Sequence, residues 1–290
     1  MKKIVQFCLI VFALSWLAAG IFYASGADFK SSAGFCFAAG YMFFPLISVI
    51  IMQLIYKEPI LKNVGISFKI NRWWFVAWLG MTVFNLLALG VSTFIPGISF
   101  TTESPEVQQS IAQMSEQIPD ANAMTVLFLS IFSGLMAAIT INAVFSFGEE
   151  IAWRGWLLEQ FKGKSFLYTA VITGVIWGVW HFPLILMGHN YPMHPVLGAF
   201  AMIVYCVALT IVMMFIRIKA KSVIAAAIAH GSLNATAAIS VMYLSGFNDL
   251  LAGSAGLAGF AILVVVDCII VYKFRDVVVE TPKCDVSTIQ

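Results

Sequence analysis

Six polar side chains that could take part in hydrolysis stand inside apolar stretches of this chain: Glu149, Glu150, Arg154, His181, His230 and Asn234. An ionisable group at mid-membrane depth costs roughly 2.5–3.5 kcal/mol on insertion scales, so such groups face the interior of a helix bundle and find partners. A carboxylate beside an imidazole can also serve as a general base for water near neutral pH. These residue types therefore indicate a polar site, and hydrolysis is the chemistry that they suit.

The spacing of these residues divides them into groups. Glu150 and Arg154 are four residues apart, so they can meet on one helix face as an ion pair. Glu149 is rotated about 100° from Glu150 and points to a different neighbour. His230 and Asn234 are also four residues apart and present two hydrogen-bond donors side by side. We therefore expect Glu150–Arg154 to be a supporting pair that holds the bundle, and Glu149 to be the base.

The depth of the polar groups gives independent support for a site. A helix rises about 1.5 Å per residue, so counting from the nearest lysines places Glu149, His181, His230 and Asn234 roughly 14–25 Å below the face that carries those lysines. The three helices run in different directions, and unrelated positions would be scattered in depth. Their convergence on one slab near mid-membrane indicates that they form a single site.

Composition defines the class of protein. Of 290 residues, 61% are hydrophobic and only 10% charged, and the mean hydropathy is +0.95, whereas soluble domains have about 25% charged residues. We therefore expect one all-α domain, residues 1–290, that crosses the membrane several times.

The net charge of +2 comes with no basic run, so nucleic acid is not an expected partner. The five cysteines are scattered without CxxC spacing, which argues against a disulfide framework or a metal knuckle.

About eight apolar runs are long enough to cross a bilayer core of about 30 Å, which takes about 20 helical residues: 4–25, 34–56, 73–96, 125–160, 166–187, 195–216, 222–244 and 253–273. The first run follows two lysines like a signal peptide, but it is long for one, so we expect a membrane helix. Outside the membrane, Ser104-Pro105-Glu106 and the apolar spacing after it predict a short amphipathic helix within the loop 97–121.

The basic residues predict the orientation. Fourteen of the 16 Lys and Arg residues lie before the first run, after the last, or in alternate loops. Under the positive-inside rule, both termini are then cytoplasmic.

The remaining polar and aromatic side chains have simpler interpretations. Asp267, near the end of its helix, is expected to be structural, and His189 and His194, in an outer loop, to be solvated. The tryptophans near the polar residues are expected to serve packing rather than recognition: Trp153, Trp156, Trp177 and Trp180.

The motifs EExxxR, WxxxH and HxxxN, in this order on three membrane helices within residues 125–244, resemble the CAAX protease and bacteriocin-processing (CPBP) family. The family's eight-helix plan agrees with the eight apolar runs. Trp177 stands where the family usually has phenylalanine, which is expected to change the shape of the pocket more than the chemistry.

The resemblance implies an intramembrane endopeptidase that opens toward the cytoplasm and acts on a peptide or protein reached from there or from the bilayer lipid. Glu149 and His181 would activate water, His230 and Asn234 would stabilise the oxyanion, and Glu150 with Arg154 would support them. No cofactor is expected. Because no organelle signal is recognisable, we expect a prokaryotic plasma membrane.

Two other interpretations stay open. Glu149, His181 and His230 could instead bind zinc in a metalloprotease, although no HExxH motif is present. The chain could also be a non-proteolytic protein that binds a peptide, such as a bacteriocin-immunity factor.

Overall fold

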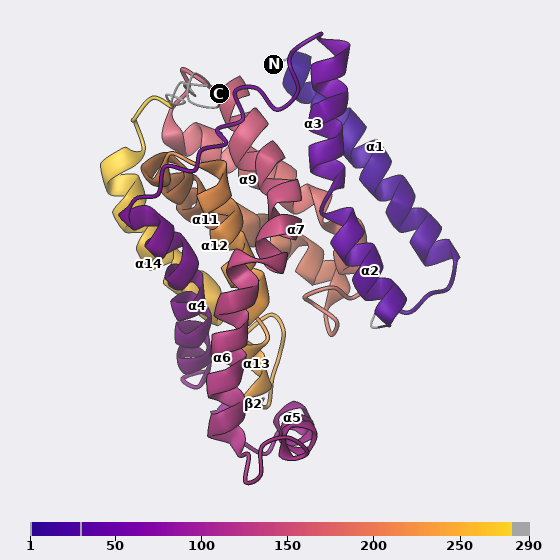
Figure 1. Ribbon diagram of the computed structural model, residues 1–290, viewed down its shortest axis with the longest axis vertical. Helices are drawn as coiled ribbons and strands as arrows, with labels where there is room; N and C mark the ends of the chain where they lie inside the picture. The colour runs from indigo at the N-terminus through magenta and orange to yellow at the C-terminus, as the bar shows by residue number, and fades with distance from the viewer. Residues whose placement is uncertain (1, 30, 280–290) are drawn as a thin grey trace.

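The computed structural model describes residues 2–29 and 31–279, so the predictions that concern Lys30, Lys283 and Cys284 lie outside the described residues. The described chain is a helical bundle with one two-stranded antiparallel ribbon (Figure 1). Its elements are α1 (Lys2–Ala24), α2 (Ser32–Tyr41), α3 (Phe44–Ile55), α4 (Arg72–Ser92), β1 (Ser99–Phe100), α5 (Pro105–Ser115), α6 (Ala123–Ile139), α7 (Ile141–Glu150), the π-helix η1 (Ile151–Trp156), α8 (Leu157–Gln160), α9 (Phe166–Trp180), α10 (Phe182–Leu186), α11 (Pro195–Ala220), α12 (Val223–Thr236), α13 (Ile239–Met242), β2 (Leu244–Ser245) and α14 (Leu257–Phe274).

The expected multi-pass membrane architecture is confirmed. In the described chain, six helical segments are long and apolar enough to span a bilayer, and the bent pair Ala123–Ile139 and Ile141–Gln160 makes a seventh. The remaining expected run, 166–187, holds the shorter apolar helix α9, which ends at Trp180, and α10 follows directly after His181. The two paired strands, Ser99–Phe100 and Leu244–Ser245, are a small addition to the expected all-α fold.

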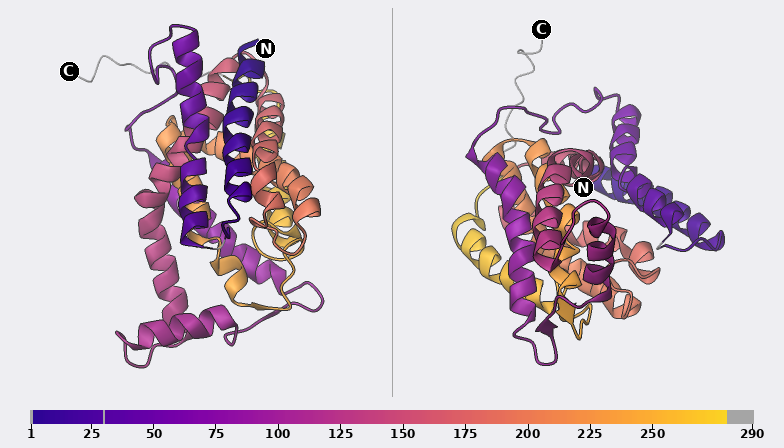
Figure 2. Two further views of the ribbon diagram at one scale, coloured as in Figure 1. Left: turned by 90° about the vertical axis from the view of Figure 1, so that its right-hand side faces the viewer. Right: turned by 60° about the horizontal axis from the view of Figure 1, so that its bottom comes forward.

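The expected amphipathic helix in the loop 97–121 is α5. Ser104 caps it by accepting a hydrogen bond from the Val107 amide, Pro105 occupies the first turn, and Glu106 complements the helix dipole there. Val107 is its fully buried residue. The helix lies across one end of the bundle, nearly perpendicular to the long helices (Figure 2).

The bend between α6 and α7 creates the site's geometry. The two helices meet at Thr140 at an angle of 50°. Helix α12 crosses this bend at Gly231, where an added Cβ would lie 2.8 Å from the Ala138 carbonyl oxygen and 3.0 Å from the Ala143 amide nitrogen. The absent side chain therefore allows a close approach, which brings His230 against the end of α7.

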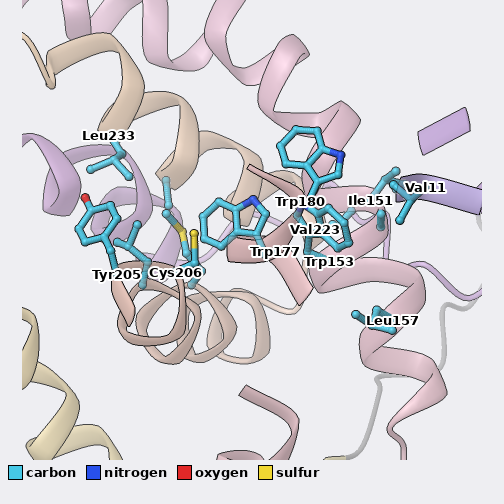
Figure 3. Packing of buried hydrophobic residues seen from close by; sticks show 14 of the residues in the cluster. Val11, Ile151, Trp153, Leu157, Trp177, Trp180, Tyr205, Cys206, Val223 and Leu233 are labelled. Carbon is cyan, nitrogen blue, oxygen red and sulfur yellow. The ribbon is translucent and has the colours of Figure 1, made fainter. Parts of the chain in front are cut away.

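The buried core contains several aromatic side chains, among them Trp153, Trp177 and Trp180 (Figure 3). From α1, Phe7 packs against Trp153 and Trp156 with ring centroids 5.8 and 5.0 Å apart. The Trp180 indole N–H donates to the hydroxyl of Ser15 at 2.8 Å, which satisfies two polar groups inside the bundle. Helix α1 is thus packed directly against the helices that carry the motifs.

Candidate active site

The two adjacent glutamates end α7 and are almost completely buried, with 2% of Glu149 and none of Glu150 exposed. They are followed by the π-helix η1, a rare conformation that is common at functional sites. As the sequence predicts, they point to different neighbours. Each glutamate therefore has its own set of hydrogen-bond partners.

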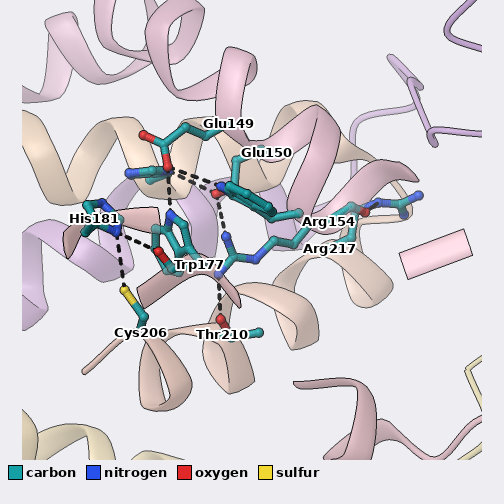
Figure 4. A network of polar contacts seen from close by, with 10 residues as sticks. Glu149, Glu150, Arg154, Trp177, His181, Cys206, Thr210 and Arg217 are labelled. Carbon is teal, nitrogen blue, oxygen red and sulfur yellow. Dashed lines mark hydrogen bonds and ion pairs between the residues drawn. The ribbon is translucent and has the colours of Figure 1, made fainter. Parts of the chain in front are cut away.

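Glu150 belongs to a buried charged network (Figure 4). Its Oε1 accepts hydrogen bonds from Arg154 at 2.8 Å and from Nδ1 of His230 at 3.0 Å. The second terminal guanidinium nitrogen of Arg154 donates to the Thr210 hydroxyl at 3.0 Å. The backbone carbonyl oxygen of Arg154 accepts a hydrogen bond from Nε of Arg217 at 3.1 Å. The predicted Glu150–Arg154 pair is confirmed, and the histidine joins this pair.

Glu149 is held by tryptophan indoles. Its Oε2 accepts hydrogen bonds from Nε1 of Trp177 at 2.7 Å and from Nε1 of Trp153 at 3.3 Å. Two neutral donors thus stabilise this buried carboxylate. All four tryptophans lie in the buried core, as expected, and these two also donate hydrogen bonds to Glu149. The four-residue spacing from Glu149 to Trp153 was a sequence signal for this second role.

Trp177 also contacts the other motif residues. Its ring lies 4.2 Å from the guanidinium carbon of Arg154, a cation–π distance, and its centroid is 5.4 Å from the His230 ring. Its carbonyl oxygen lies 2.9 Å from Nδ1 of His181. A single side chain thus connects all three motifs, and a phenylalanine here would lack the N–H that reaches Glu149.

The hydrogen bonds of the two histidines indicate which ring nitrogen carries a proton in each. A carbonyl oxygen can only accept, so Nδ1 of His181 carries the proton and donates to Trp177. The Nε2 of a neutral His181 is then a proton acceptor. Nδ1 of His230 donates to the Glu150 carboxylate, so its Nε2 can donate only when the ring is an imidazolium, the form that the carboxylate favours.

Glu149, His181, His230 and Asn234 line one cavity of about 590 Å³. Asn234 is exposed there, one helical turn beyond the buried His230. The sulfur of Cys206, which the sequence did not single out, lies 3.8 Å from Nδ1 of His181. The structure therefore brings the four predicted catalytic residues to one hollow, with Glu150 and Arg154 behind its wall.

The expectations for two histidines need correction. His189 lines the cavity half-buried, with its ring centroid 5.4 Å from that of Phe29, and its burial lowers its pKa to about 4. His194 is paired at 2.6 Å with the buried carboxylate of Asp249 rather than free in solvent. Asp267 is buried in α14 and keeps its structural interpretation.

The donors do not fit the zinc alternative in this conformation. Within residues 2–29 and 31–279, no three His, Cys, Asp or Glu side chains are arranged to hold a metal ion.

Comparison with known proteins agrees with these motifs. Residues 123–236, which contain all six motif positions, match the family described as Type II CAAX prenyl endopeptidase Rce1-like. A stretch of 44 residues is 36% identical to CAAX prenyl protease 2 of Methanococcus maripaludis, and covers 15% of this chain and 16% of that protein. The segment 123–236, with its complete set of motifs, is therefore similar to the family of CAAX prenyl endopeptidases.

Proposed function

We propose that this membrane protein is an endopeptidase that hydrolyses peptide bonds within the bilayer without a metal ion. The observation that carries the proposal is the shared cavity of a buried carboxylate, two imidazoles and an amide. The family match supports hydrolysis of a peptide substrate.

In the proposed reaction, Glu149 and Nε2 of His181 bind one water molecule. Glu149 accepts its proton as the water oxygen attacks the scissile carbonyl carbon. The two indole donors hold the Glu149 carboxylate in place while the proton moves.

The oxyanion that forms is stabilised by Nε2–H of a protonated His230 and by the amide N–H of Asn234. The C–N bond then breaks, and the departing amine takes the proton held by Glu149. Glu150 keeps His230 protonated and oriented, and Arg154 balances the second carboxylate.

The test uses purified wild type and the variants Glu149→Gln and His230→Ala on fluorogenic peptides, farnesylated and unmodified, with and without a strong zinc chelator. We expect cleavage by wild type alone and no effect of the chelator. Loss of activity on chelation that returns with added zinc would favour the metalloprotease instead. Absence of cleavage together with tight, saturable peptide binding would favour the binding or immunity function.

A further inference from the structure

The cavity that holds the polar site lies on one side of the helix bundle, away from the basic loops. Helices α11 and α12 line it with the halves that are distant from their basic ends. Helix α11 ends in Arg217 and Lys219, yet it contributes Met202 to Leu209. Helix α12 begins next to Lys221, yet it contributes His230 to Asn234.

The rest of the wall follows the same rule. It includes the loop between α10 and α11, through His189 to Pro192, and the loop before α14, through Phe247 to Ala255. Neither these loops nor any other described part of the wall contributes a lysine or arginine. Asn234 and Ala238 are exposed at its edge, so the hollow reaches the molecular surface there.

The opposite end of the site is closed by the basic loop between α3 and α4. Val64 is buried, and its carbonyl oxygen would lie 2.9 Å from a Cβ at Gly155 in η1. The loop is anchored to the start of α12, where the Val223 amide donates to Gly65 at 2.9 Å and the Ser222 hydroxyl donates to Ser67 at 2.5 Å.

The buried charged network lies between this loop and the cavity. Arg217 donates to the carbonyl of Arg154, whose side chain pairs with Glu150. A separate hollow at the basic end, of about 370 Å³, is lined by Glu58, Lys62, Trp156 and Glu159 among others and by none of the motif residues. A substrate that approached from the basic face would therefore meet packed backbone and buried charge.

Basic loops mark the cytoplasmic face of a membrane protein. We infer that the site is entered from the extracytoplasmic face, and that its substrate is a peptide segment exposed there or in the outer leaflet. The inference rests on the proposed hydrolysis and differs from the cytoplasmic opening that the family resemblance implies. It excludes cytoplasmic carboxyl-terminal tails as substrates.

The access face can be measured without activity. In a background with the five native cysteines replaced by alanine, Ala238→Cys probes the mouth of the cavity, Met193→Cys the loop beside it, and Lys162→Cys the basic end. A membrane-impermeant maleimide is applied to intact spheroplasts and to inverted vesicles. We expect positions 193 and 238 to react in spheroplasts, and position 162 only in inverted vesicles. Reaction of position 238 only in inverted vesicles, or in neither preparation when it reacts in detergent, would overturn the inference.

A second experiment tests from which side of the membrane a peptide is cleaved. Spheroplasts that express wild type or Glu149→Gln receive an impermeant fluorogenic peptide that the purified enzyme cuts in detergent. We expect cleavage by wild-type spheroplasts above the Glu149→Gln background. Cleavage confined to inverted vesicles would overturn the access inference and leave the proposed hydrolysis intact. Absence of cleavage in detergent would instead count against the proposed function, while the maleimide pattern would still decide the access face.

Discussion

The indole N–H of Trp177 donates to Oε2 of Glu149 across 2.7 Å, inside a bundle where both side chains are at most 2% exposed. This bond joins the second motif to the first through the position at which the family usually has phenylalanine. The carboxylate that we propose as the base is thus oriented by a neutral donor. The substitution at this position changes the chemistry of the site as well as its shape.

Replacement of Trp177 by phenylalanine tests this bond. A hydrogen bond to a charged group contributes about 1.5–3 kcal/mol, so we expect kcat to fall by roughly 10- to 100-fold while KM changes little. The matched control is Trp180→Phe, whose indole donates to Ser15 instead of the carboxylate. Equal losses of kcat in the two variants, measured on one peptide, would show that Trp177 serves packing alone.

The two adjacent glutamates should respond differently to the same change. In Glu149→Gln, the amide oxygen can still accept from the indoles, so we expect lost activity with a melting temperature close to that of wild type. In Glu150→Gln, Arg154 and His230 lose a buried carboxylate, and breaking a buried pair costs about 3–5 kcal/mol. We therefore expect Glu150→Gln to melt well below wild type. Thermal unfolding in detergent checks both, and similar melting temperatures would contradict the assigned division of roles.

The pair Glu150–Arg154 should also be energetically coupled to a degree that single variants do not reveal. Once either partner is removed, the other is left as an uncompensated buried charge. We expect the double variant Glu150→Gln/Arg154→Met to be less destabilised than the sum of the single variants, by roughly 0.5–3 kcal/mol. Strictly additive unfolding free energies would show that the two side chains act independently.

Gly231 is predicted to set the distance between α12 and the α6–α7 bend. A methyl group at Gly231 would lie 2.8 Å from a backbone oxygen of α6, and such overpacking costs about 1–3 kcal/mol. We expect Gly231→Ala to lower both the melting temperature and kcat, because His230 moves with the helix. Gly80→Ala is the matched control, since its nearest neighbour would be 3.9 Å away in a side chain. Unchanged kinetics in Gly231→Ala would refute this role.

The burial of the loop residue His189 should make the stability of the folded protein depend on pH. Its burial lowers its pKa from 6.5 to about 4 in the folded protein, so between these values the unfolded chain binds a proton that the folded chain does not. Stability should then fall as the pH is lowered from 7 toward 4. We expect the drop in melting temperature between pH 7 and pH 5 to be smaller in His189→Gln than in wild type. An identical drop would mean that the imidazole is accessible to solvent.

The sequence by itself determined the features that depend on local patterns. Apolar runs define the membrane helices, a capping serine followed by proline defines α5, and four-residue spacing brings Glu150 to Arg154. These features depend on neighbours within one or two helical turns, which the sequence shows directly. The common depth of the polar residues also follows from counting along helices, and it identified the set that lines the cavity.

Only the tertiary structure decided which polar groups meet. His230 bonds Glu150 from 80 residues away, and Trp177 reaches Glu149 across 28 residues. Rotation and crossing of packed helices set these pairs, and helical periodicity does not encode how one helix turns toward another. The closed basic end and the open opposite end have the same origin, because loop 57–71 folds back against η1 and α12 through contacts between segments distant in the chain.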